Sequence, residues 1–87
     1  MMAIYKQMDA MLSKVEETIA MARSEWEEGQ KLEYYDQEEY SLLQQRINEV
    51  EDELSHLLRS TTPQQRVELE RAQARLRQMQ NAMILGQ

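Results

Sequence analysis

The sequence predicts an all-α protein: an elongated, coiled-coil-like, antiparallel three-helix bundle that forms a single helical domain over residues 1–87. Strong helix formers dominate the composition, with two Gly and one Pro in the whole chain. Apolar residues also recur at alternating spacings of three and four along three segments, which places them on one face of a helix. Because β-branched residues never alternate in a run, we expect no strand.

The first apolar stripe predicts a helix over about residues 3–28. Gly29 is expected to end this helix, because a residue without a Cβ readily adopts the left-handed conformation of a C′ position. The stripe consists of Met8, Leu12, Val15, Ile19, Ala22 and Trp26.

The second stripe predicts a helix over about residues 36–60. Asp36 is expected to cap it, with Glu39 reaching back in a capping-box-like arrangement. Tyr35 and Tyr40 have the spacing of a hydrophobic staple, which would fix how the chain enters the helix. The stripe consists of Tyr40, Leu43, Ile47, Val50, Leu54 and Leu57.

The third stripe predicts a helix over about residues 63–84, which Gly86 can close. Thr62 has the position of an N-cap, Pro63 stands at N1 where no amide is missed, and Gln65 stands at N3. The short connection before it favours an antiparallel hairpin with the second helix, and the first helix then packs across their seam. The stripe consists of Leu69, Ala72, Leu76, Met79 and Met83.

The charges support this arrangement and limit the classes of partner. Residues 1–28 carry three basic and six acidic groups, residues 29–60 three and eight, and residues 61–87 four and two, so a basic third helix lies beside two acidic ones. The net charge of −6 disfavours nucleic acid and anionic membranes. No apolar stretch approaches the roughly 20 residues of a membrane helix, so we expect a cytoplasmic protein.

Catalytic, cofactor-binding and metal-binding residues are not expected. With no cysteine, the chain cannot form disulfides or cysteine zinc sites. Glu53 and His56 have the Glu-x-x-His spacing of di-iron bundles, but such a site needs two of these motifs and further inward glutamates, so a solvated acidic face is the better interpretation. The clustered carboxylates lack a water-excluding pocket that would shift their pKa values, and the scattered serines lack a well-placed base. The protein is therefore interpreted as a non-enzyme.

Three further groups of residues are candidate binding surfaces. The arginines of the third helix could contact phosphates, but Glu68 and Glu70 interrupt them, and pairing within the bundle is the better explanation. Methionines adapt to irregular partner surfaces, although we expect most of them in the core. The surface that we select for a partner is an aromatic cluster at one end of the bundle, and a structural staple is its alternative interpretation. The cluster consists of Trp26, Tyr34, Tyr35 and Tyr40.

Three stretches resemble the YtzC-like family of small uncharacterised proteins from spore-forming Gram-positive bacteria. They are Asp36-Gln37-Glu38-Glu39-Tyr40-Ser41, Gln64-Gln65-Arg66 with Leu69, and Gln78-Met79-Gln80-Asn81-Ala82-Met83-Ile84-Leu85. The resemblance covers residues 33–85. It implies a short cytoplasmic helical protein and transfers no catalytic residue.

These observations favour a non-enzymatic helical protein–protein interaction module that forms a homodimer or binds another protein. A phosphatase-like regulator of a signalling protein is the first alternative, from size, acidity and the resemblance. A nucleic-acid accessory protein that uses the third helix is the second, and its binding would weaken steeply with salt.

Overall fold

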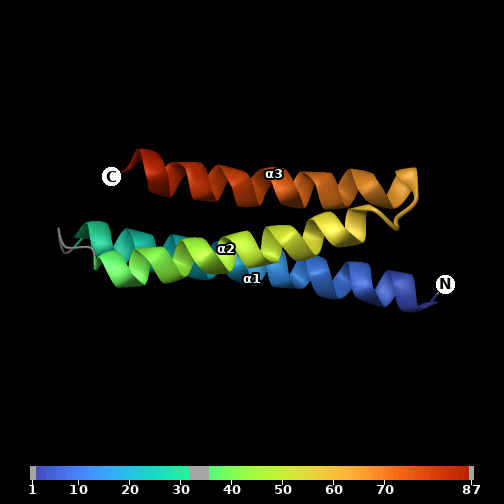
Figure 1. Cartoon of the computed structure of the whole chain (residues 1–87), viewed down its shortest axis with the longest axis horizontal. Helices are drawn as coiled ribbons and strands as arrows, with labels where there is room; N and C mark the ends of the chain where they lie inside the picture. Colours follow the sequence, from blue (N-terminus) through green and yellow to red (C-terminus); the bar gives the residue numbers. More distant parts are fainter. Residues whose placement is uncertain (1, 32–35, 87) are drawn as a thin grey trace.

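The computed structural model describes the backbone of residues 2–31 and 36–86 and the side chains of residues 6–30 and 36–86. It contains three helices, α1 (Met2–Lys31), α2 (Gln37–Leu58) and α3 (Pro63–Leu85), and no strand within the described residues. α1 and α3 run in one direction and α2 runs in the other (Figure 1). The predicted all-α antiparallel three-helix bundle is therefore confirmed.

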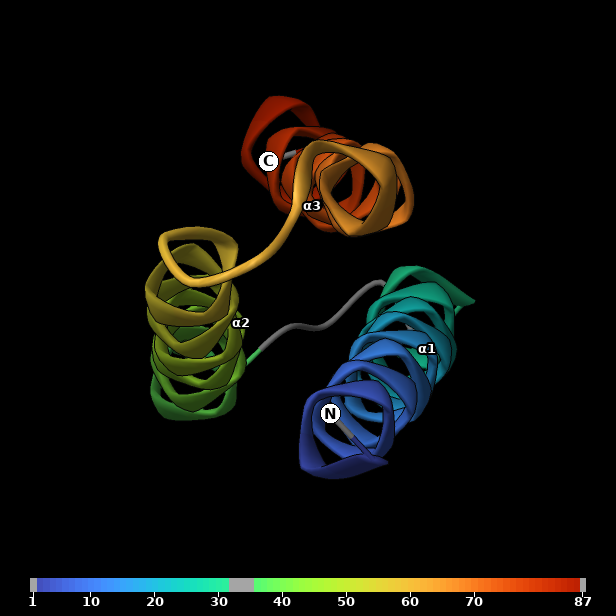
Figure 2. The ribbon, with the colours of Figure 1, turned by 90° about the vertical axis from the view of Figure 1, so that its right-hand side faces the viewer.

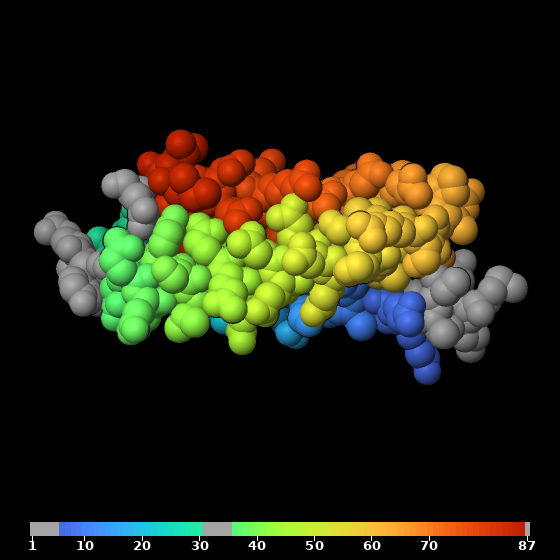
Figure 3. Space-filling model, in the orientation of Figure 1, coloured from blue at the N-terminus to red at the C-terminus, as the bar shows by residue number. Residues whose placement is uncertain are grey.

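The bundle is slender. It measures 48 × 19 × 17 Å, with a radius of gyration of 14.3 Å. Viewed end-on, the helices stand at the corners of a triangle, and each one contacts the other two (Figure 2). α2 and α3 lie side by side along the length of the molecule (Figure 3). This shape leaves long seams between helices open to solvent.

The core consists of one apolar stripe from each helix. The predicted stripe of α3 is buried in full, and that of α2 is buried except at its two ends, where Tyr40 and Leu57 are half-buried. Burying a large aliphatic side chain contributes about 1.5–3 kcal/mol, so these stripes account for most of the stabilisation. The buried apolar residues are Met11, Val15, Ile19, Ala22, Leu43, Ile47, Val50, Leu54, Leu69, Ala72, Leu76, Met79 and Met83.

The buried face of α1 contains Val15, Ile19 and Ala22 of the predicted stripe, and it also contains residues outside that stripe. Met11 and Thr18 are buried, whereas Leu12 is half-buried at the margin. Met11 and Thr18 stand at three-and-four spacing with Val15 and Ala22, so the buried face is broader on this side than the predicted stripe. The Thr18 hydroxyl donates to the Lys14 carbonyl oxygen at 2.7 Å, which satisfies the buried polar group within the helix.

The prediction that Gly29 ends the first helix is wrong, because α1 continues through Gly29 to Lys31. A glycine inside a helix costs about 1 kcal/mol relative to alanine. That cost does not end a helix whose face is packed over many turns, and the neighbours Glu28 and Gln30 are good helix formers.

The helix caps follow local sequence closely. Thr62 and Gln65 form the predicted capping box. The backbone N–H of Gln65 donates to the Thr62 hydroxyl at 3.3 Å, and the backbone N–H of Thr62 donates to the side-chain oxygen of Gln65 at 3.2 Å. Asp36 caps α2 by accepting from the Glu38 amide at 2.8 Å. A reciprocal bond from Glu39 is not among the hydrogen bonds of the described residues, and the predicted staple partner Tyr35 lies outside them.

α2 ends at Leu58, two residues before the predicted boundary. Ser60 and Thr61 follow, and their hydroxyls donate to the carbonyl oxygens of Leu57 and Leu58, both at 3.1 Å. These bonds satisfy carbonyl groups that lack a partner at the end of a helix. The chain then turns directly into the Thr62 cap of α3.

Candidate functional site

An open groove follows the seam between α1 and α2, near the C-terminal end of α1 and the N-terminal end of α2. Its volume is 680 Å³. We call it the α1–α2 groove. It is lined by Met21, Glu25, Glu28, Gly29, Asp36, Glu39, Leu42, Leu43, Gln45, Arg46 and Glu49.

Helical spacing explains why these residues share one groove. Met21, Glu25 and Glu28 stand four and three residues apart on α1, so they form one row. On α2, a second row is formed by residues at spacings of three, four and three. Its members are Glu39, Leu42, Arg46 and Glu49.

The described lining of the groove is acidic, because it contains five carboxylates and one guanidinium. The Arg46 guanidinium donates across the seam to the Sδ atom of Met21 at 3.2 Å, and the Gln45 amide donates to Glu49 at 3.5 Å. Within the described residues, the three ion pairs lie elsewhere and use none of the five groove carboxylates. The lining carboxylates are Glu25, Glu28, Asp36, Glu39 and Glu49.

Leu42 and Met21 supply accessible apolar surface in the groove lining, and we call these two residues its apolar centre. Its side chain is 64% exposed, although the adjacent Leu43 is buried in the core. Met21, on the opposite helix, is half-buried and also lines the groove. The site therefore combines an exposed apolar centre with a charged rim.

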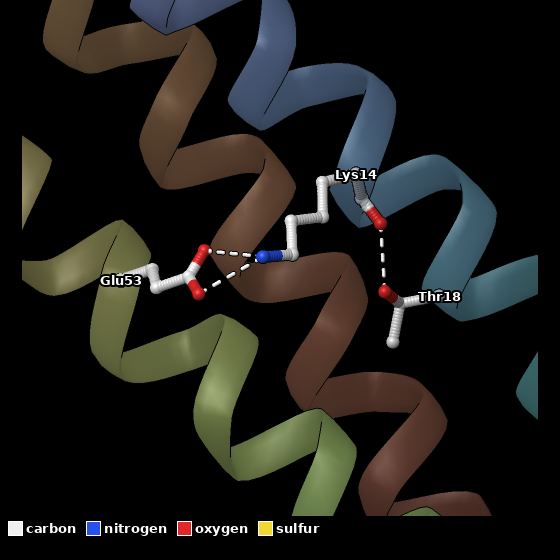
Figure 4. A network of polar contacts seen from close by, with 3 residues as sticks. All are labelled: Lys14, Thr18 and Glu53. Atoms are coloured by element: carbon white, nitrogen blue, oxygen red, sulfur yellow. Dashed lines mark hydrogen bonds and ion pairs between the residues drawn. The ribbon is translucent and has the colours of Figure 1, made fainter.

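The Lys14–Glu53 ion pair bridges the same seam on the far side of Met21. The Lys14 Nζ atom donates to both carboxylate oxygens of Glu53, at 2.9 and 2.8 Å, and links α1 to α2 (Figure 4). A second hollow, which shares Met21, Arg46 and Glu49 with the α1–α2 groove, continues along the seam to this pair.

The two described members of the predicted aromatic surface, Trp26 and Tyr40, do not line the α1–α2 groove. Trp26 is half-buried and lines a separate hollow between α1 and α3, with Arg75 and Met79. Tyr40 is half-buried against the core, and its hydroxyl accepts from the Gln44 amide at 3.1 Å. Tyr34 and Tyr35 lie outside the described residues.

The Glu53 and His56 pair has no metal-binding geometry. Both side chains are exposed, and Glu53 is held by Lys14. Across residues 6–30 and 36–86, no group of three or more His, Cys, Asp or Glu side chains could hold a metal ion.

Two arginines of α3 pair within the bundle, as predicted. Arg75 forms an ion pair with Glu16 of α1, and Arg77 donates to Glu51 of α2 at 2.5 Å. The hydrogen bond from Arg75 holds the pKa of the Glu16 carboxyl below its ordinary value of 4.5, and Glu16 in turn raises the pKa of Arg75. Arg66 donates to the carbonyl oxygen of Leu58 at 3.4 Å.

Sequence reasoning missed the α1–α2 groove. The available signal was Leu42, an apolar residue one position off the α2 stripe, with carboxylates three residues before it and seven after it. A single apolar residue on a polar face is common on protein surfaces. Only the neighbouring row on α1 makes it the centre of a groove.

The fold and this groove define a small, elongated helical-bundle protein with an acidic inter-helix surface. The chain belongs to the family described as "Protein of unknown function (DUF2524)", whose model matches residues 2–85. No curated protein and no solved structure matches the chain. In the part of the chain that the structure describes, no helix has the length and apolar character needed to cross a membrane.

Proposed function

We propose that this protein is a non-enzymatic protein–protein interaction module whose contact surface is the α1–α2 groove. The observation that carries the proposal is Leu42, which is 64% exposed and belongs to the α2 row of the groove, with Glu39 before it and Glu49 after it. An apolar centre surrounded by a polar rim is the usual organisation of a protein interface.

The physical basis is burial of apolar area at the centre of the groove. Covering Leu42 and the exposed part of Met21 would gain about 25 cal/mol per Å² of apolar surface removed from water. The surrounding carboxylates would act mainly on association rate and on the choice of partner. In such an interface, the central apolar contacts supply most of the affinity and the charged rim supplies the specificity.

Three further predictions belong to this proposal. The protein acts without catalysis, in the cytoplasm, and its partner is another protein or a second copy of the chain. The exposed apolar centre supports a protein partner of either kind. The resemblance to the YtzC-like family supports the cytoplasmic assignment.

Affinity purification from the cells that make the protein tests the contact surface. Wild type is compared with Leu42→Asp and with Val67→Asp, a matched control at an exposed apolar position on α3. We expect wild type and Val67→Asp to retain the same proteins and Leu42→Asp to lose them. Circular dichroism checks that both variants fold, since neither side chain is buried.

Solution mass by light scattering across a dilution series completes this test. A dimer that Leu42→Asp converts to a monomer would identify a second copy as the occupant and still support the groove as an interface. Recovery of the same proteins by all three chains, with unchanged mass, would refute the proposed contact surface.

A further inference from the structure

We infer that the occupant of the α1–α2 groove is a basic amphipathic helix of a partner protein, an inference that rests on the proposed function. Among the described residues, five carboxylates and one guanidinium line the groove together with Leu42. An occupant must therefore offer an apolar stripe to the centre and positive charge to both walls.

The dimensions of the groove match a helix of a few turns. The α2 wall from Asp36 to Glu49 contains fourteen residues, and the thirteen rises between them cover about 20 Å at about 1.5 Å each. The α1 wall from Met21 to Gly29 contains nine residues, and the eight rises between them cover about 12 Å. A helix laid into a groove between two helices contacts it through residues at i, i+3, i+4 and i+7. Leu42 and Met21 offer the surface against which such a stripe packs.

The carboxylates stand on both sides of this apolar centre. Glu25 and Glu28 belong to the α1 wall, and Glu39 and Glu49 belong to the α2 wall. Lys or Arg residues on both flanks of an amphipathic helix would therefore each meet a carboxylate. None of these carboxylates takes part in an ion pair within the described residues, so no described cation competes with an incoming one for them.

Arg46 is the one cation among the described residues that line the groove, and its guanidinium donates to the Sδ atom of Met21 at 3.2 Å. It lies over apolar surface instead of neutralising a carboxylate. A partner helix that displaces this contact would uncover Met21 and extend the apolar centre beside Leu42.

A second copy of the chain is a poor match by charge. The chain carries a net charge of −6, and its only basic segment is residues 61–87. Two of the four arginines in that segment, Arg75 and Arg77, already pair with Glu16 and Glu51. Two copies would therefore bring acidic surfaces together, and like charges across an interface oppose association.

The inference is tested by titrating the full-length protein with a synthetic, fluorescein-labelled 14-residue peptide. The peptide places Leu at i, i+3, i+4 and i+7 and Lys at the flanks, and its control has the same composition in an order without a helical stripe. Fluorescence anisotropy measures both affinities. We expect the striped peptide to bind at least about tenfold more tightly, which corresponds to about 1.4 kcal/mol.

Two variants of equal net charge distinguish the effect of the groove carboxylates on peptide affinity from the effect of the overall charge of the protein. The groove variant combines Glu25→Gln, Glu28→Gln, Glu39→Gln and Glu49→Gln. The control combines Glu27→Gln, Asp52→Asn, Glu68→Gln and Glu70→Gln, which are exposed and do not line the groove. We expect affinity for the striped peptide to fall about tenfold in the groove variant and less than about threefold in the control.

Equal losses in the two variants, or equal binding of the two peptides, would overturn the inference, because net charge alone would then explain the attraction. The same variants in the affinity purification separate this inference from the proposed function. Proteins lost by Leu42→Asp but kept by the groove variant would show a contact surface whose occupant is not cationic. Proteins lost by both but kept by the control would support the basic helix.

Discussion

The indole ring of Trp26 on α1 occupies the space that a Cβ atom on Gly86 would fill at the C-cap of α3. A Cβ built at Gly86 would meet the indole Cζ2 atom in a severe overlap and would stand 3.0 Å from Cη2. The backbone of Gly86 is right-handed, with φ −78° and ψ −5°, a conformation open to any residue. Glycine is therefore needed here for the close approach of two helices and not for its conformational freedom.

Gly86→Ala should lower stability because the indole must move away from α3. Overpacking typically costs about 1–3 kcal/mol, whereas the reduced entropy of the unfolded chain returns about 0.4–1 kcal/mol. We expect a net loss of stability, measured by thermal denaturation. We also expect a red shift of the tryptophan fluorescence, which reports on Trp26 because it is the only tryptophan. A variant at least as stable as wild type, with unchanged fluorescence, would contradict this contact.

Gly29→Ala, in contrast, should raise the stability of the protein. Gly29 lies inside α1, where alanine is favoured over glycine by about 0.5–1 kcal/mol. Urea denaturation followed by circular dichroism measures the change. A destabilised Gly29→Ala variant would indicate a backbone conformation at this position that alanine does not tolerate.

Leu54→Ala and Leu76→Ala should each destabilise the bundle by about 2–5 kcal/mol, because each removes a fully buried side chain and leaves a cavity. Leu42→Ala is the matched control, since Leu42 is exposed, and its effect should stay within about 0.5 kcal/mol. Thermal melting compares the three variants. Equal effects at Leu42 and Leu54 would be inconsistent with the register of α2.

Thr62→Ala should cost about 0.5–2 kcal/mol, because it removes the acceptor for the Gln65 amide. Thr62→Ser retains that hydroxyl and should recover most of the loss. Gln64→Ala is the control for replacing a polar residue by alanine at an exposed position of the same turn. Denaturant midpoints rank the three variants, and a Ser variant as unstable as Ala would argue against the cap.

The Glu16–Arg75 ion pair should make stability depend on pH in acid. The pKa of Glu16 is lowered below 4.5 in the folded protein, so its contribution is present above the unfolded pKa and is lost as pH falls through the folded pKa. Wild type should exceed Glu16→Gln in stability at neutral pH, and the difference should shrink below pH 4.5. Glu17→Gln provides the neighbouring control. A difference that is constant with pH would exclude this pair as its source.

The sequence by itself determined the elements and much of the core. Thr62, Pro63 and Gln65 fixed the start of α3, and Asp36 fixed the start of α2, because a cap is satisfied by groups within four residues of it. The three-and-four spacing of apolar residues likewise identified the buried faces of α2 and α3. These features depend on local geometry, which the order of residues specifies directly.

Tertiary structure decided the features that depend on pairs of residues distant in the chain. Helix packing buries Met11 and Thr18 on α1 and leaves Leu12 half-buried. It also stabilises α1 beyond Gly29, where the sequence predicted its end. It also made Arg75 the partner of Glu16, 59 residues away, and brought Leu42 and Met21 into the lining of one groove. Helical periodicity gives the face of each residue but not the rotation of one helix against another. That rotation is fixed when three apolar stripes are buried together, and it determines which charges meet and where a groove stays open.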